Sequence, residues 1–359
     1  MMIYENVHVL DFSSLYPNLI RQMRLSPENE YSVNFNQDIN MNLVIDKKEF
    51  NEKNGLLDSY ITELLDLRRE YRQKGMESEQ LAVKIIANSV YGLLSQKTAK
   101  FILGGTNIAA TVSWVGRTIL QTLVKELPKY DMEVVYGKTD SIFVIDLKNR
   151  ENSGYEVLHI AQHLVDQIVK KLTGFENRFI TFDYEEFLTK FLVVNKNNYV
   201  KLHKDNSRKM KGASFYNSKS SQFEVDLMNH VLDNLLDGSV FYKRDVQLLA
   251  NKYMESKLKK PLSYFAIKHK PRQLAVNKWD NCQYMREHDI DVQWGFYHNA
   301  VVANGMNNPT GVLVFPLDYE PESKYTINRN WVQFTVDKVV NKLNLKDREL
   351  QTSLTNFFR

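Results

Sequence analysis

The stretch VVYGKTDSIFV at residues 134–144 constrains the fold most strongly, because its pattern fits strands and a turn but not a helix. Two runs of β-branched and aromatic residues flank the break Gly137-Lys138-Thr139-Asp140. Such runs predict two strands joined by a tight turn. The turn ends in an aspartate, which a hairpin of this kind presents at the edge of a sheet. One carboxylate is a poor site for a divalent cation, so a second is expected elsewhere.

The sequence NVHVLDFSSLYP at residues 6–17 supplies a candidate for that second carboxylate. Val7, Val9 and Asp11 fall on one face of the strand predicted over residues 3–12, since side chains alternate with a period of two. Taken alone, Asp11 reads as a cap for the helix that begins near Ser14. Paired with Asp140, it can instead hold two Mg²⁺ ions, the clamp used in phosphoryl transfer.

A helical hairpin is predicted over residues 56–73 and 79–95, with a tight link at Lys74-Gly75. Ser78 is the expected cap of its second helix. The apolar side of that helix is expected to contain Leu81, Ile85 and Ile86.

Cationic and amide side chains follow both helices at helical spacing. Arg68 and Arg72 are four residues apart, and Lys84, Asn88 and Tyr91 share one face of the second helix. Facing a metal site, these groups would form a cradle for a triphosphate. The alternative is an ordinary solvated face. Asn88 and Tyr91 beside Gly92 argue against it, because that face is neither apolar nor simply charged.

The remaining pattern is mixed. Further helices are predicted over 107–127 and 155–172, and strands over 179–184, 190–195 and 198–203; residues 26–54 read as a long irregular connection and residues 222–359 as mostly helical, with an apolar stretch at 311–317. A length of 359 residues suggests about two or three domains. A lone cysteine excludes an internal disulfide and fits a reducing compartment, and no run of apolar residues reaches membrane-span length.

Charge is distributed unevenly along the chain. Residues 190–219 carry eight Lys/Arg against one acid, and residues 257–278 carry seven against none, whereas the formal net charge of the whole chain is only +4. A basic segment on an acidic body indicates either a polyanionic partner or a solvated lysine-rich surface.

Three stretches resemble the polymerase motifs of B-family DNA polymerases, in the family's order: DFSSLYP (11–17), KIIANSVYG (84–92) and YGKTDS (136–141). Shorter matches are SPEN (26–29), SWVGR (113–117), KNNY (196–199), KMKG (209–212) and the thumb-like KYTINRNWVQFTVDKVVNKL (324–343). The resemblance is close to the archaeal members and covers the whole chain.

This resemblance implies an α+β fold with the right-hand architecture: an antiparallel-sheet palm, short helical-hairpin fingers and a mainly helical thumb. It places the palm at residues 1–54 and 104–205, the fingers at 55–103, the thumb at 206–350 and a tail at 351–359. It implies template-directed DNA synthesis from dNTPs on primer-template DNA with two Mg²⁺ ions, in a chain without a membrane segment and with a cytoplasmic location in an archaeal or viral setting.

The resemblance also implies residue roles. Asp11 and Asp140 match the metal-holding catalytic aspartates, with the Phe12 carbonyl as a further ligand, and Asp183 or Glu185 matches an auxiliary acid. The nucleotide contacts implied are Tyr16, which excludes a 2′-hydroxyl, and Arg68, Arg72, Lys84, Asn88 and Tyr91. The DNA contacts implied are Gly92, Thr139, Lys196, Tyr199 and Lys211.

The chain departs from the family pattern at Lys138, where the third motif usually reads YGDTDS, and at KNNY, where the family is more basic. It also starts at the first palm strand, whereas full-length members carry an N-terminal domain and a 3′–5′ exonuclease before it. We therefore expect the C-terminal part of a split polymerase, with a separate N-terminal/exonuclease polypeptide, or a reduced one. The alternative is a catalytically weak, DNA-binding, clamp-tethered accessory subunit; a two-metal nuclease would leave the triphosphate cradle without a use.

The last residues, QTSLTNFFR, match the sliding-clamp peptide pattern through Gln351, Leu354, Phe357 and Phe358. As one helical turn, the last three would form an apolar plug for a pocket on the clamp. The alternative is the buried end of the last helix.

Deletion of residues 351–359 is expected to remove stimulation by the cognate clamp while extension on short templates persists, because only the plug is lost. Alanine at Phe357 and Phe358 should act alike. Primer extension with and without clamp measures this, and a truncated protein that unfolds would instead identify the tail as core.

Overall fold

The computed structural model describes residues 1–26, 55–96, 105–150, 153–212, 215–270, 282–306 and 310–346. Contacts divide the chain into two compact units, a first unit of Tyr4–Thr189 and a second unit of Met1–Ile3 with Lys190–Arg359. This division falls earlier in the chain than the palm–thumb boundary expected at residues 205/206. The domain assignment itself stays a prediction.

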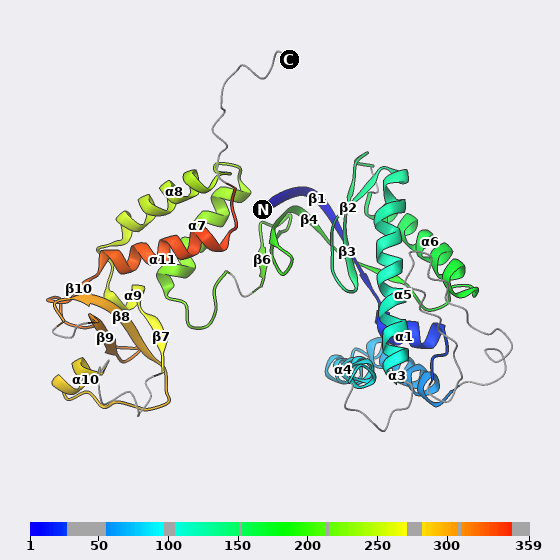
Figure 1. The fold of residues 1–359 in the computed structure, drawn as a ribbon, viewed down its shortest axis with the longest axis horizontal. Helices are drawn as coiled ribbons and strands as arrows, with labels where there is room; N and C mark the ends of the chain where they lie inside the picture. The colour runs from blue at the N-terminus through cyan, green and yellow to red at the C-terminus, as the bar shows by residue number, and fades with distance from the viewer. Residues whose placement is uncertain are drawn as a thin grey trace, which may run out of the picture. The chain divides into compact units, whose positions relative to one another are not determined.

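An antiparallel sheet forms the base of the first unit. Strands β1 (Met2–Phe12), β2 (Met132–Gly137), β3 (Ser141–Asp146) and β4 (Phe182–Asn195) lie in the order β2-β3-β1-β4 (Figure 1). β1 is central and antiparallel to β3, with Val7 opposite Ile145 and Asp11 opposite Ser141. Central strands buried on both faces read as continuous apolar runs, and four successive β1 residues, 7–10, are buried. The predicted hairpin around Gly137 is confirmed.

Helices cover this sheet and build its core. They are α1 (Leu15–Gln22), α5 (Gly105–Glu126), the 3₁₀ turn η1 (Leu127–Tyr130) and α6 (Ser153–Thr173). Leu10, Val112, Ile119 and Val165 are fully buried in the cluster that these helices share with the sheet. Helices bury their apolar faces by packing against a face of a sheet. This packing holds the ends of β1 and β3 in place.

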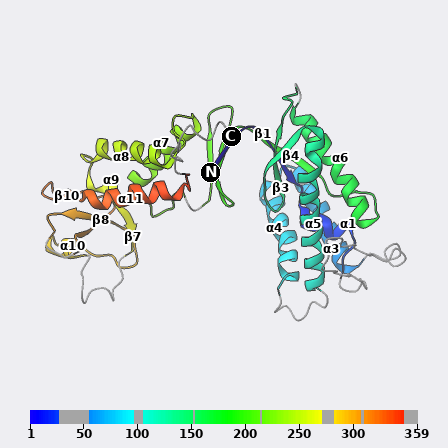
Figure 2. The same ribbon diagram turned by 45° about the horizontal axis from the view of Figure 1, so that its top comes forward.

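The predicted helical hairpin is present as α3 (Leu56–Gln73) and α4 (Glu77–Leu94), which pack on each other and lie beside α5 (Figure 2). Gly75 ends α3 with φ +69°, and the Met76 amide reaches back to the Tyr71 carbonyl at 2.9 Å. A left-handed residue of this kind favours glycine and stops the helix within one residue. This sharp stop makes the hairpin short, as the sequence predicts.

Two details of α4 were predicted wrongly. The N-cap is Met76 without a side-chain hydrogen bond, rather than Ser78. Leu81, Ile85 and Ile86 are 51%, 58% and 45% exposed, while the residues that face α3 are Val83 and Ala87. The small side chains of Val83 and Ala87 let α4 approach α3 closely. The larger apolar residues, from which the buried face was predicted, therefore lie on the exposed face of α4.

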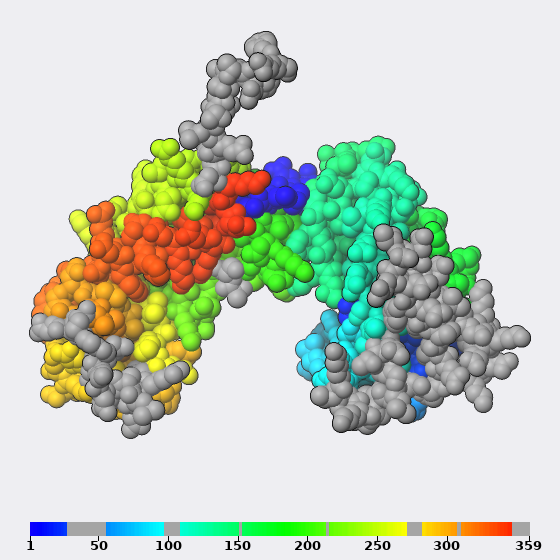
Figure 3. Space-filling view, viewed as in Figure 1, coloured from blue at the N-terminus to red at the C-terminus, as the bar shows by residue number. Residues whose placement is uncertain are grey.

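The second unit begins within β4, which continues into pairs with β5 (Asn198–Leu202) and, beyond it, β6 (Arg208–Lys211). Its helical layer consists of α7 (Gln222–Leu236), α8 (Lys243–Lys257) and α11 (Arg329–Lys342); α11 packs along α8, as the red and yellow-green surfaces in Figure 3 show. Buried Glu224 joins two of these helices through Lys342 at 2.8 Å and Lys338 at 3.2 Å.

A second antiparallel sheet was not predicted. It contains β7 (Ile267–His269), β8 (His298–Asn304), β9 (Val312–Phe315) and β10 (Thr326–Ile327), with the short helices α9 (Leu262–Phe265) and α10 (Gln283–Glu287) beside it. The reading of residues 222–359 as mostly helical therefore holds for α7, α8 and α11 but missed this sheet. The fold class, α+β with antiparallel sheets, is confirmed.

Candidate active site

The turn of the β2–β3 hairpin meets the end of β1. The Phe12 amide donates to the Asp140 carbonyl at 2.7 Å, and the turn closes on itself through the Lys138 amide and the Ser141 carbonyl at 2.8 Å. With Asp11 opposite Ser141 in the strand register, Asp11 and Asp140 are held at one edge of the sheet. The structure thus brings together the two aspartates that the sequence pairs.

Further acids surround Asp11. Burial raises the pKa of Asp11 to about 6, and the charges of Asp140, Glu185 and Asp183 raise it too, while Lys84 opposes them. A carboxyl whose neighbours repel its charge is one that a divalent cation would stabilise. The arrangement suits a divalent cation, and the N-cap residue of α1 is Ser14 rather than Asp11.

The donor set fits Mg²⁺. Carboxylate and carbonyl oxygens are the hard ligands that this ion prefers, and it is usually bound by one or two carboxylates plus substrate phosphates. Among the described residues, no three His, Cys, Asp or Glu side chains form a ligand set by themselves. Asp11, Asp140 and the Phe12 carbonyl therefore make an incomplete shell of the kind that a triphosphate would complete. The Phe12 ring is buried and stacked on Phe182 at 3.8 Å, which fixes its backbone.

A cavity of about 870 Å³ opens beside these acids. Its walls come from β1, α1, the hairpin turn, β4 and the α3–α4 pair. It contains every nucleotide contact that the resemblance implies, together with the aspartates and the turn: Asp11, Phe12, Tyr16, Arg68, Arg72, Lys84, Asn88, Tyr91, Lys138, Thr139 and Asp140. Residues distant in sequence therefore line one space. Arg68, Arg72 and Lys84 come from the helices, and the acids other than Glu77 come from the strands and the hairpin turn.

Arg68 is already held in place. Its guanidinium donates to the Ser14 hydroxyl at 2.5 Å and to the Gln80 amide oxygen at 3.5 Å. Ser14 has a left-handed backbone with φ +51° at the start of α1, which turns the chain sharply after β1. Burial lowers the pKa of Arg68, and the charge of Arg72 lowers it further. Two cations this close to each other favour an anionic ligand between them.

Tyr16 and Tyr91 form the aromatic floor of the cavity. Their ring centroids are 4.3 Å apart, and the Tyr91 hydroxyl bonds to the Ser113 hydroxyl at 2.5 Å. Burial raises the pKa of Tyr16, assisted by Tyr91 and Asp140. The Tyr16 ring thus rests against a second ring that is itself held by a hydrogen bond.

Lys138 lines the cavity with an exposed side chain that makes no ion pair within the described residues. Its contribution to the turn is its backbone amide alone. The charge of Lys84 lowers the pKa of the Asp11 carboxyl against the effect of its acidic neighbours.

Of the predicted DNA contacts, Thr139 lines the cavity, whereas Gly92, Lys196, Tyr199 and Lys211 are not among its lining residues. Gly92 on α4 faces open space, since nothing lies within 4 Å of where a Cβ would stand. Lys196, Tyr199 and Lys211 belong to the second unit, where Tyr199 pairs with Lys211 in the β5–β6 register and is only 5% exposed. The clamp-binding residues Gln351, Leu354, Phe357 and Phe358 lie outside the described residues.

Sequence reasoning missed Glu77, Gln80 and Ser14 as cavity residues. Gln80 precedes Lys84 by one helical turn and so falls on the face already singled out, which is the signal that could have found it. Ser14 carried no such signal, because its contact with Arg68 joins residues far apart in sequence.

The sequence matches DNA polymerase family B over residues 2–304. The chain belongs to this family. It is 27% identical over 258 residues to the DNA polymerase alpha catalytic subunit of Drosophila melanogaster, covering 65% of this chain and 16% of that protein. It is 25% identical over 247 residues to a DNA polymerase of Thermococcus gorgonarius, covering 65% of this chain and 30% of that protein.

The fold is also similar to that of a solved family B DNA polymerase from Pyrobaculum calidifontis. The match has a TM-score of 0.64 at 18% identity and covers 98% of this chain and 46% of that one. The chain therefore spans less than half the length of these relatives. No helix within the described residues is long and apolar enough to cross a membrane.

In metal-free protein, Asp11→Asn should raise the stability near pH 7.5 by roughly 1–2 kcal/mol, after allowance for solvent screening. The raised pKa of about 6 means that the folded state binds the proton more tightly than the unfolded chain. The free energy of unfolding of the wild-type protein therefore falls as the pH rises from about 4 to about 6 and Asp11 ionises. The Asn variant does not ionise at this position and keeps its stability.

Denaturant unfolding in EDTA at pH 4 and pH 7.5 measures this effect. The gain should vanish at pH 4, and the same substitution at exposed Asp318 is the control. An equal gain at both pH values would show that the charge of Asp11 is not what destabilises the protein.

Proposed function

We propose that this chain is the catalytic core of a template-directed DNA polymerase that transfers a nucleotide from a dNTP to a primer 3′-hydroxyl. One observation carries the proposal: the strand-end aspartates Asp11 and Asp140 share a single cavity with the cationic faces of α3 and α4. A nuclease needs the acids but has no use for a cluster of cations and an amide opposite them. A triphosphate needs both.

Asp11, Asp140 and the Phe12 carbonyl would hold two Mg²⁺ ions. When bound, such ions lower the pKa of the attacking hydroxyl and offset the negative charge that develops on the transferred phosphate. The acids at Asp183 and Glu185 keep the local potential negative, which favours loading of cations.

The α3–α4 face would bind the triphosphate. Arg68, Arg72 and Lys84 supply charge, and Asn88 supplies an amide donor on the same helix face as Lys84. Since Arg68 is held by Ser14 before any substrate arrives, less side-chain entropy is lost when the triphosphate binds. In-line transfer needs the α-phosphate fixed against the primer end, and this clamp is what would fix it.

Tyr16 would lie under the deoxyribose. Its ring rests on Tyr91 at 4.3 Å, so it cannot yield to an extra 2′-hydroxyl without displacing a second ring. Selection for dNTPs would follow from this packing rather than from a hydrogen bond.

Primer-template DNA would be bound without regard to sequence, because base pairing supplies the specificity. The contacts proposed are Gly92 and Thr139 in the first unit and Lys196, Tyr199 and Lys211 in the second. The excess of Lys and Arg over acids in residues 190–219 and 257–278 of the sequence suits a phosphate backbone. A sliding clamp is proposed as a further partner, because residues 351–359 carry the clamp-peptide pattern.

Asp140→Asn is expected to lower the rate of nucleotide incorporation by at least about a thousandfold, a barrier increase of about 4 kcal/mol. The reason is the loss of a charged metal ligand at an otherwise unchanged strand end. Primer-template affinity should stay near wild type. Single-nucleotide extension and DNA titration measure the two effects, with Asp318→Asn as the control; incorporation at the wild-type rate would remove Asp140 from the site.

Lys138→Asp is expected to lower the Mg²⁺ concentration for half-maximal extension, because the lysine repels ions that load beside it. The maximal rate should stay within roughly tenfold, a barrier change of about 1.4 kcal/mol. A Mg²⁺ titration of both proteins measures this. A variant that needs more Mg²⁺ than wild type would make Lys138 a triphosphate contact.

The same titration tests the alternative function. If wild type is inert at every Mg²⁺ concentration and Lys138→Asp is active, the chain is a disabled polymerase that serves as a DNA-binding accessory subunit.

A further inference from the structure

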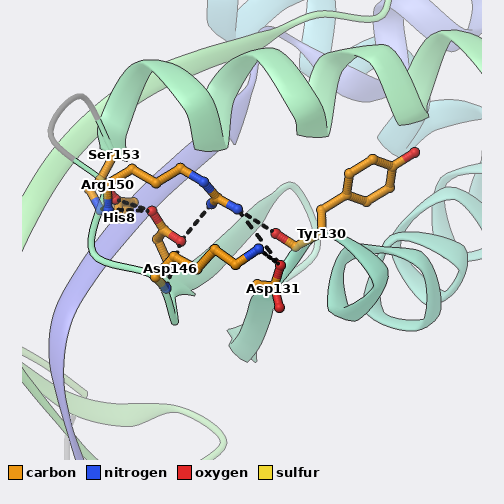
Figure 4. Close-up of polar contacts among 7 residues, drawn as sticks. His8, Tyr130, Asp131, Asp146, Arg150 and Ser153 are labelled. Atoms are coloured by element: carbon orange, nitrogen blue, oxygen red, sulfur yellow. Dashed lines mark hydrogen bonds and ion pairs between the residues drawn. The ribbon is translucent and has the colours of Figure 1, made fainter.

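A chain of four polar side chains runs behind the acidic edge of the sheet. His8 on β1, Ser153 at the start of α6, Asp146 at the end of β3 and Tyr184 on β4 come from four different elements. His8 Nε2 lies 2.9 Å from Ser153 Oγ, which lies 3.1 Å from Asp146 Oδ2, and His8 Nδ1 lies 2.8 Å from the Tyr184 hydroxyl. Figure 4 shows the first three side chains meeting between β1, β3 and α6.

Asp146 anchors this chain as a charge. It is 2% exposed, pairs with Arg150 at 2.6 Å, and accepts the backbone amides of Lys148 and Arg150, each at 3.1 Å. Burial raises the pKa of Asp146, but these hydrogen bonds and the Arg150 charge outweigh it and hold the pKa below its usual value. An ionised carboxylate only accepts hydrogen bonds, so Ser153 must donate to it.

That constraint sets the direction of every other bond. With its hydrogen directed at Asp146, Ser153 Oγ must accept from His8 Nε2–H. A neutral imidazole with the proton on Nε2 has a bare Nδ1, which accepts from the Tyr184 hydroxyl. Burial lowers the pKa of His8 despite the charge of Asp146, in keeping with a neutral ring. The result is one unbroken order: Tyr184 donates to His8, His8 to Ser153, and Ser153 to Asp146.

The last member of the chain lies between two acids of the candidate site. All three residues line the cavity, but side chains alternate along a strand, so the Tyr184 side chain leaves the opposite face of β4 from those of Asp183 and Glu185, whose charges act on Asp11. Its ring packs against the start of α6, where a Cβ on Gly154 would lie 3.0 Å from it. Fixing the Tyr184 hydroxyl therefore fixes the strand that carries these acids.

We propose that His8 is a positioning residue that, through its bare Nδ1, holds the Tyr184 hydroxyl and so keeps the acids of β4 in register with Asp11. Its role in metal loading rests on the proposed polymerase function. The direction of the hydrogen bonds does not, and it can be tested on metal-free protein.

Two substitutions of His8 distinguish the hydrogen bond made by Nδ1 from the one made by Nε2. Asn carries an acceptor oxygen near the position of Nδ1 and can keep the Tyr184 bond, whereas Gln carries a donor near the position of Nε2 and can keep only the Ser153 bond. Both lose the ring contact with Phe187, whose centroid lies 5.1 Å away. Asn is one methylene smaller than Gln, so packing loss alone would make His8→Asn the more damaging variant, the opposite of the order expected here. Tyr184→Phe removes the same bond from the other side.

Two readouts are needed besides activity. Nitrogen-15 NMR of the metal-free protein reports the tautomer of His8 among the eight histidines, with the His8→Asn spectrum as the assignment. Mn²⁺ binding followed by electron paramagnetic resonance reports cation loading, and a Mg²⁺ titration of primer extension separates half-saturation from maximal rate.

We expect an Nε2–H tautomer at pH 7.5 in wild type. His8→Gln and Tyr184→Phe should each weaken Mn²⁺ binding and raise the half-saturating Mg²⁺ concentration by about tenfold. This is the lower end of the loss in metal affinity seen when residues that support metal ligands are changed. His8→Asn should stay within about twofold of wild type. The maximal rate at saturating Mg²⁺ should change little in all three.

An Nδ1–H or doubly protonated ring in wild type overturns the inference, and so does equal weakening by His8→Asn and His8→Gln. If wild type extends no primer, the proposed function fails, and the tautomer and Mn²⁺ binding still decide the role of His8. If a variant does not fold, the wild-type tautomer and the remaining variants decide it.

Discussion

The hydrogen bond from the Phe12 amide to the Asp140 carbonyl is the contact on which the site depends. It ties the hairpin turn to the end of β1, so that two aspartates distant in sequence lie at one edge of the sheet. Bringing like charges together is unfavourable, and the pKa of Asp11, raised to about 6 by burial and by its acidic neighbours, records that cost. The repulsion does not separate the two aspartates, because strand pairing and the core packed behind β1 hold the backbone in place.

Aspartates on the two faces of the sheet have opposite electrostatic environments. Asp146, with Arg150, Ser153 and backbone amides around it, has a lowered pKa and a fully compensated charge. Asp11 has a raised pKa and only Lys84 to oppose its neighbours. Satisfied charges hold structure together, whereas an unsatisfied cluster is available to a ligand. β1 links them, because residues three apart on a strand, His8 and Asp11, point to opposite faces.

Local pattern was enough to place α3 at Leu56–Gln73 and the break between β2 and β3, since helical period and turn chemistry are encoded in neighbouring residues. It failed for α4, where apolar residues occur on two sides and only the partner helix decides that Val83 and Ala87 go inside. It also missed β7–β10, whose strands are only two to seven residues long and so carry little pattern. It missed the His8–Ser153–Asp146 chain because His8 lies far from the other two residues in sequence and no motif links them.

Lysine at position 138, where the family motif usually has aspartate, changes the charge of the cavity lining without changing the fold of the turn. The turn uses only the amide of residue 138, which would be present with aspartate or lysine alike, and the exposed side chain adds no packing. The substitution therefore costs the hairpin little, and its consequences are electrostatic. Lys84 is a cation whose charge opposes the acidic neighbours of Asp11. At partly solvated distances one charge is worth only about a kcal/mol or a few, enough to shift ion loading but too little to dismantle the site.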